Sequence, residues 1–128
     1  MHRTLRPFEL LEPEDMGQAL RLLSIHGKEA KVLAGGLNLV SDMRRWLCHP
    51  EYVLSIRRLP GLNYVEADNA GGIQIGALTT IRSLELSPLI QRESFLLHEA
   101  VRQIASVQVK TMGTAVGNLC AASPASDI

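Results

Sequence analysis

The stretch Val32-Leu33-Ala34-Gly35-Gly36-Leu37-Asn38-Leu39 places two adjacent glycines between an apolar run and an amphipathic segment. Its pattern predicts a short buried strand over residues 31–34, a forced turn at the glycines, and a helix over residues 38–46. Leu39, Met43 and Trp46 are expected to face inward on that helix. Unpaired backbone N–H groups at a helix start favour an anion, above all a phosphate.

The same residues also allow a purely structural reading. The stretch matches neither the phosphate-binding loop Gly-x-x-x-x-Gly-Lys nor the dinucleotide fingerprint Gly-x-Gly-x-x-Gly. Taken alone, two glycines in this position are more often a left-handed turn than an anion site. The pattern therefore leaves both alternatives open.

On either side of this stretch the chain predicts the rest of a small α/β unit. Residues 13–15 open a helix, because proline and acidic residues suit its first turn. Along it, a stripe at helical spacing is expected to face the core: Met16, Ala19, Leu20 and Leu23. A second strand is predicted over residues 52–56, and a turn at 59–61 ends the unit.

A second unit is expected from residue 61 onward. Residues 63–67 and 73–77 alternate like strands around a glycine-containing turn, which predicts a hairpin. A short capped helix is expected from 79 to 84, and a longer amphipathic one around residues 97–105. We expect residues 111–128 to form a long irregular loop; its segment 113–118, alone a plain loop by pattern, could share a diphosphate with the first glycines.

Composition excludes several classes of function. The 128 residues carry 13 basic and 13 acidic side chains, so a net charge of zero argues against nucleic acid as the main partner. Cys48 and Cys120 lie far apart without a metal-binding spacing. The N-terminus lacks the apolar run of a signal peptide, and no stretch is long and apolar enough to span a membrane, so a cytoplasmic location is expected.

Several motifs acting together identify a family. Residues 32–39, Ile75-Gly76-Ala77-Leu78-Thr79-Thr80, residues 104–118 and residues 123–127 resemble the FAD-binding medium subunit of molybdenum hydroxylases such as xanthine and carbon monoxide dehydrogenases. The resemblance covers essentially the whole chain. It implies an α+β fold of the p-cresol methylhydroxylase type: an N-terminal α/β subdomain (1–60), then the incomplete first part of a mixed α+β subdomain (61–128), with FAD between them. The chain is accordingly expected to be part of a longer protein.

The resemblance also implies which residues hold FAD. Backbone N–H groups of residues 34–38 would cradle one side of the diphosphate, residues 114–118 would hold the other, and Asp127 would accept hydrogen bonds from cofactor hydroxyls. With the packing leucines included, the implied set is Leu33, Ala34, Gly35, Gly36, Leu37, Asn38, Leu39, Thr114, Ala115, Val116, Gly117, Asn118 and Asp127. No catalytic residue and no metal ligand is expected on this chain.

Four positions qualify the resemblance. Leu37 replaces a small polar residue of the family, which removes a hydroxyl contact. Val116 replaces the first glycine of a Gly-Gly pair, so it would be strained at a positive φ or against a phosphate. Ile104 aligns with a family position that can line the cofactor pocket, but packing in the helix core is the favoured expectation. Lys110 is expected either to be solvated or to contact the cofactor.

The implied function is that of an FAD-binding component that relays electrons from iron–sulfur clusters through FAD to an external acceptor. Its implied partners are a large subunit with the molybdenum cofactor and a small [2Fe–2S] subunit, with no nucleic acid and no membrane; self-association of an exposed half-cleft is a further expectation. Two alternatives stay open. One is a non-catalytic remnant or assembly module without FAD, and the other is a different nucleotide or phosphate binder that uses residues 34–38 alone.

Overall fold

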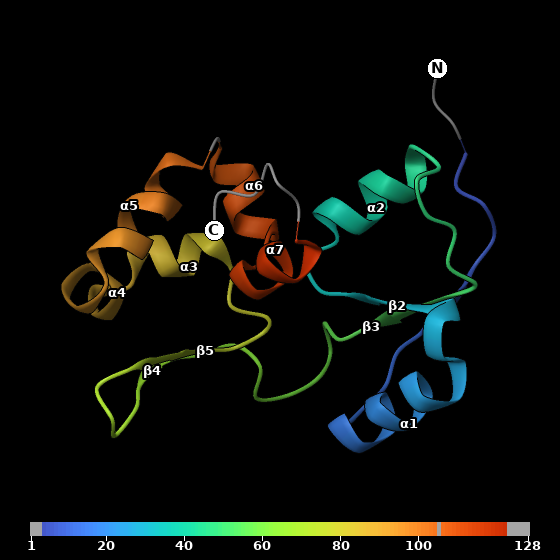
Figure 1. Cartoon of the computed structure of the whole chain (residues 1–128), viewed down its shortest axis with the longest axis horizontal. Helices are drawn as coiled ribbons and strands as arrows, with labels where there is room; N and C mark the ends of the chain where they lie inside the picture. Colours follow the sequence, from blue (N-terminus) through green and yellow to red (C-terminus); the bar gives the residue numbers. More distant parts are fainter. Residues whose placement is uncertain (1–3, 105, 123–128) are drawn as a thin grey trace. The chain divides into compact units, whose positions relative to one another are not determined.

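The structure is a computed structural model that describes residues 4–104 and 106–122 (Figure 1). The chain forms two compact units, Met1–Pro60 and Gly61–Ile128. Within the described residues, no helix is long and apolar enough to cross a membrane.

The first unit is built on a parallel sheet of three strands in the order β1-β3-β2. The strands are β1 (Glu9–Leu11), β2 (Ala30–Leu33) and β3 (Tyr52–Ser55). The central strand β3 buries Val53 and Leu54 almost completely, as expected for a parallel strand paired on both sides. The predicted strand at 31–34 is confirmed in place, but the prediction that it is buried is wrong. As an edge strand, β2 buries only its first residue.

Helix α1 (Met16–His26) begins where the sequence predicts. The Asp15 carboxylate caps it by accepting a hydrogen bond of 2.7 Å from the backbone N–H of Gln18. The expected inward stripe is only partly confirmed: Ala19 is buried, whereas Met16 and Leu20 are 47% and 59% exposed. Three strands of three or four residues offer too little apolar area to cover the whole stripe. A one-turn helix, η1 (Gly27–Glu29), leads from α1 into β2.

Helix α2 (Leu37–Arg44) is shorter than the predicted range of 38–46. It ends in a Schellman motif, because the N–H groups of Trp46 and Leu47 donate to the carbonyls of Met43 and Asp42. Trp46 takes the left-handed position of that motif, with φ at 61°. The prediction that Trp46 faces the core is therefore wrong, and its side chain is 42% exposed. Met43 is buried as predicted.

The second unit starts with the predicted hairpin, formed by the antiparallel strands β4 (Val65–Ala67) and β5 (Ile73–Ile75). The Asp68 side chain stabilises the turn by accepting hydrogen bonds from the N–H groups of Ala70 and Gly72. Gly71 has a φ of 84°, which suits glycine.

Short helices make up the rest of the described second unit. They are α3 (Ile81–Leu86), α4 (Pro88–Glu93), α5 (Phe95–Gln103), α6 (Val107–Met112) and α7 (Ala115–Ala121). Their core consists of Ile81, Leu84, Ile90, Val101, Ile104 and Ala115, with hydrophobic residues of β4 and β5 packed against it. The expectation that Ile104 packs in the core is confirmed.

Two helices contradict the predicted loop over residues 111–128. Helix α6 extends to Met112 and helix α7 covers Ala115–Ala121; residues 123–128 lie outside the described part. Each helix has six or seven residues, too few to show a clear hydrophobic period. Helix α4 was missed for the same reason.

A close backbone contact at Gly76 joins the segment that follows β5 to the segment that precedes β4. The Gly76 N–H donates to the carbonyl of Tyr64 at 2.9 Å, and a Cβ on Gly76 would lie 2.2 Å from the carbonyl oxygen of Leu62. Next to it, the buried Thr79 hydroxyl donates to the Tyr64 carbonyl and accepts from the Tyr64 N–H. Only glycine fits at position 76.

We expect Gly76→Ala to lower the free energy of unfolding by about 3 kcal/mol, because the backbone around it must move apart. Gly71→Ala is the matched control in the same hairpin, because its Cβ would meet nothing within 4 Å. It should lower the free energy of unfolding only by the cost of placing alanine in the left-handed region, about 1–2 kcal/mol. Urea unfolding followed by far-UV circular dichroism measures both. Equal losses for the two variants would contradict the close contact.

Candidate functional site

The first glycine segment, residues 33–39, connects β2 to α2 within the first unit. Gly36 is the N-cap of α2 with a φ of 83°, so the predicted forced turn is confirmed. A Cβ at Gly36 would also lie 3.1 Å from Cδ1 of Leu33. Both observations make glycine the residue that this position requires.

The start of α2 leaves backbone donors available. Within the described residues, no side chain caps the first turn, since Gly36 has none to offer. The N–H groups of Leu37, Asn38 and Leu39 have no acceptor inside the helix, and the helix dipole places partial positive charge there. Asn38 is exposed, and Leu37 and Leu39 are half-buried. This is a local geometry that accepts an anion.

The second glycine segment, residues 113–118, has a different structure. Gly113 is the C-cap of α6 with a φ of −71°, and Thr114 is the N-cap of α7. The Thr114 hydroxyl accepts from the Gly117 N–H at 3.1 Å, and the Thr114 carbonyl accepts from the Asn118 N–H at 3.0 Å. The prediction of a plain loop over 113–118 is wrong, because α7 begins inside it. The first-turn N–H groups of Ala115 and Val116 have no acceptor inside α7.

Val116 is not strained by its backbone. Among the described residues, the only non-glycine residues with a positive φ are Trp46 and Ala122. Val116 lies in the first turn of α7, where any L-residue fits, and it is half-buried. The conformational objection to valine at this position is therefore removed.

The residues expected to bind the cofactor are spread over both units and beyond the described residues. The segment 33–39 belongs to the first unit and the segment 114–118 to the second. Asp127, expected to accept hydrogen bonds from the cofactor, lies outside the described residues.

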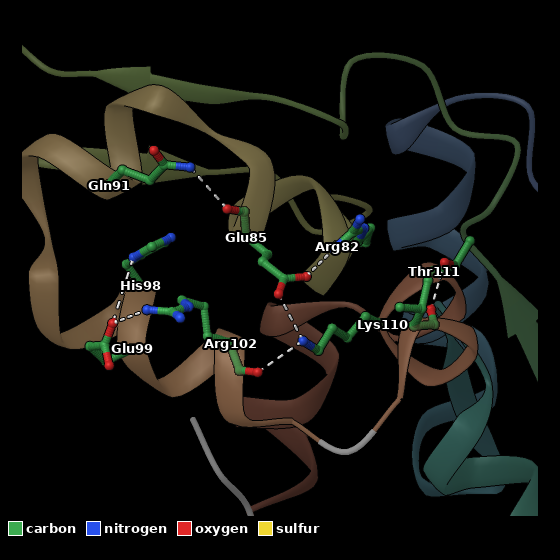
Figure 2. Close-up of polar contacts among 9 residues, drawn as sticks. Arg82, Glu85, Gln91, His98, Glu99, Arg102, Lys110 and Thr111 are labelled. Atoms are coloured by element: carbon green, nitrogen blue, oxygen red, sulfur yellow. Dashed lines mark hydrogen bonds and ion pairs between the residues drawn. The ribbon is translucent and has the colours of Figure 1, made fainter.

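Lys110 has neither a solvated position nor a free ammonium group. Its side chain is 6% exposed, and its Nζ donates to Oε1 of Glu85 at 3.0 Å and to the carbonyl of Arg102 at 3.1 Å (Figure 2). Arg82 donates to the other carboxylate oxygen of Glu85 at 2.5 Å. The expectation of a solvated Lys110 is wrong.

These two cations lower the pKa of Glu85. Hydrogen bonds from Lys110 first, and from Arg82 second, hold the pKa of Glu85 below its ordinary value. The carboxylate is ionised at neutral pH and, because of these hydrogen bonds, stays ionised further into the acid range than an ordinary glutamate. The spacing of Arg82 and Glu85 indicates a helix pair, but Lys110 is remote in sequence and only the fold brings it there.

Comparison with known proteins identifies the class to which this fold and these segments belong. The family described as "FAD binding domain in molybdopterin dehydrogenase" matches residues 6–128. This chain belongs to that family of FAD-binding domains, so the resemblance drawn from the motifs, and FAD as the cofactor of the family, are confirmed.

Individual relatives agree with this assignment. The chain is 36% identical over 120 residues to the carbon monoxide dehydrogenase medium chain of Hydrogenophaga pseudoflava, covering 94% of this chain and 42% of that one. It is 33% identical over 125 residues to the nicotinate dehydrogenase FAD-subunit of Eubacterium barkeri, covering 96% and 42%. The chain thus spans less than half the length of these relatives.

A solved structure confirms the predicted α+β fold of the FAD-binding type. The structure of the Cu,Mo-CO dehydrogenase in its cyanide-inactivated form aligns with a TM-score of 0.89 at 29% identity, covering 97% of this chain and 43% of that one.

We expect the Glu85 ion pairs to make stability depend on pH in the acid range. The pKa of Glu85 is lowered in the folded state, so the ionised carboxylate contributes fully to the free energy of unfolding above the ordinary pKa of 4.5. This contribution is lost as the pH falls through the pKa of the folded state. Unfolding free energies of wild type and Glu85→Gln, measured by urea titration from pH 7 to 3, should differ most at neutral pH and converge in acid.

Glu93→Gln serves as the control for that experiment, because it removes a carboxylate that is 51% exposed and pairs with Arg92 at the surface. Parallel profiles for wild type and Glu85→Gln throughout the acid range would show that the ion pairs do not stabilise the folded state.

Proposed function

We propose that this chain is an FAD-binding component of a molybdopterin-dependent oxidoreductase complex and takes part in relaying electrons from iron–sulfur clusters through FAD to an external acceptor. The observation that carries the proposal is the family match over residues 6–128, together with a helix start at Gly36 that has no side-chain cap among the described residues. FAD, when bound, supplies the redox chemistry.

The first segment suits one side of the FAD diphosphate. A diphosphate is an anion, and the start of α2 offers N–H donors and the positive end of the helix dipole. Gly36 carries no Cβ, so an anion can approach the backbone closely. We assign residues 34–38 to this contact, with Leu33 and Leu39 as flanking packing residues. The hydroxyl that the resemblance implies at position 37 is replaced here by the side chain of Leu37, which removes that contact and keeps the backbone donors.

The second segment is assigned to the other side of the diphosphate. Thr114 already accepts hydrogen bonds from the N–H groups of Gly117 and Asn118 inside α7. The donors that this segment can offer to the diphosphate are therefore the N–H groups of the first-turn residues Ala115 and Val116. A helix start whose N-cap is internally satisfied is rigid, which favours a fixed donor geometry. Asp127 is assigned to hydroxyl groups of the cofactor.

The protein's part in this function is to bind and orient the flavin. Two relatives that match most of this chain are named as a medium chain and an FAD-subunit, and both names are used for subunits of multi-subunit enzymes. We therefore propose a large subunit with the molybdenum cofactor and a small [2Fe–2S] subunit as partners, a cytoplasmic location, and catalytic activity only within such a complex.

The proposal predicts that the purified 128-residue chain retains FAD. After incubation with excess FAD and removal of free cofactor, absorbance between 350 and 500 nm and the native mass should show one FAD per chain. A folded chain without FAD would contradict the proposal for this chain and favour a non-catalytic module of the same fold. Val116→Gly then tests the cause: recovered binding would identify the valine side chain as the obstacle.

A second prediction concerns the first segment. Gly36→Ala forces an L-residue into the left-handed region and places Cβ against Leu33, so the start of α2 must shift and FAD should bind about tenfold more weakly. Gly27→Ala is the matched control in the same unit: its φ is also positive, at 54°, and nothing lies within 4 Å of its Cβ.

Flavin fluorescence titration measures both variants. We expect Gly27→Ala to cost stability without weakening FAD binding. If both variants bind FAD as tightly as wild type does, the first segment does not contact the diphosphate.

A further inference from the structure

The junction between α6 and α7 is held by α3. The N–H of Ile81, the first residue of α3, donates to the carbonyl of Gly113 at 2.9 Å. Thr80, which caps α3, forms an isolated antiparallel bridge with Thr114, which caps α7. The backbone of the second glycine segment therefore starts from a fixed contact with the beginning of α3.

A second contact joins the same helices at the side-chain level. Lys110 on α6 extends to Glu85 near the end of α3 and to the carbonyl of Arg102 in the last turn of α5 (Figure 2). The Arg102 carbonyl is at a helix end, where acceptors lack intrahelical donors. One ammonium group thus connects three helices, and both side chains of the ion pair are largely buried, at 6% and 16% exposure.

Stability alone is a weak explanation for this pair. Removing two charges from water costs free energy, and well-packed apolar residues often stabilise such a position equally well. An ammonium with two directed hydrogen bonds does something that an apolar contact does not, because it fixes how α6 is rotated about its axis. Lys110 lies four residues before Thr114, so a rotation of α6 would displace the cap of α7.

We propose that Lys110, paired with Glu85, is a positioning residue that sets the orientation of α6 and thereby places Thr114 and the start of α7 for FAD. This inference rests on the proposed function for its consequence on FAD binding. Its structural consequence, the placement of the Thr114 cap, is independent of the cofactor.

The surface of the same unit provides a matched control. Arg92 and Glu93 on α4 form an ion pair whose side chains are 69% and 51% exposed. Arg92→Met removes one cation from that pair, as Lys110→Met does from the buried one. Such an exposed pair contributes little to stability or geometry.

The test compares variants of the full chain under conditions where circular dichroism shows all of them folded. Two quantities are measured: the dissociation constant for FAD by flavin fluorescence, and hydrogen exchange of the Gly117 and Asn118 amides without FAD. We expect Lys110→Met to weaken FAD binding about tenfold and to accelerate both amides, with Arg92→Met unchanged. Lys110→Arg should restore both readouts, because arginine can donate to the same two acceptors.

The double variant Glu85→Leu with Lys110→Met separates positioning from stability. We expect it to unfold at a urea concentration close to that of wild type and still to bind FAD weakly and exchange the two amides quickly. If Lys110→Met does not fold, the double variant takes its place, since it removes the directed hydrogen bonds of Lys110 without leaving one partner of the ion pair as an unpaired buried charge.

Unchanged amide exchange in folded Lys110→Met, or in the folded double variant, would overturn the inference. So would wild-type FAD affinity in those variants when the wild-type chain binds FAD. If the wild-type chain binds no FAD but the two amides accelerate as expected, the positioning of the α7 cap holds and it is the proposed function that fails.

Discussion

Short helices need acceptors for the N–H groups of their first turn, and this requirement shapes both units. Helices of six or seven residues are marginal by themselves, so caps and packing decide whether they form. Side chains cap five of the helices in the described part of the chain: Asp15, Thr80, Ser87, Ser106 and Thr114. At the start of α2, by contrast, the N-cap residue Gly36 has a left-handed backbone conformation and no capping side chain.

This difference separates the two glycine segments physically. The first presents helix-start donors that an external anion can satisfy. The second satisfies two of its own donors through Thr114 and is held from outside by α3. The start of α2 therefore has donors that no side chain of the described residues uses, whereas two donors of α7 are already used within the helix.

In the second unit, contacts between residues distant in sequence support the segment 113–118. Gly76 allows the chain after β5 to approach residue 62 closely, and Thr79, just before the cap of α3, is hydrogen-bonded to the backbone of Tyr64. Glu85 and Lys110 then connect α3 with α6, four residues before the cap of α7. Each contact joins segments distant in sequence, so the geometry of the second segment is a property of the whole unit.

The sequence by itself determined the family, the hairpin, the turn at Gly36 and the start of α1, because glycine, proline and capping residues act on their immediate neighbours. Only the tertiary structure decided that residues 107–112 and 115–121 are helical, that Trp46 ends α2 instead of packing inward, and that Lys110 is buried against Glu85. These features depend on contacts across many residues, and local residue patterns carry no information on which distant side chain will supply the acceptor or the apolar surface.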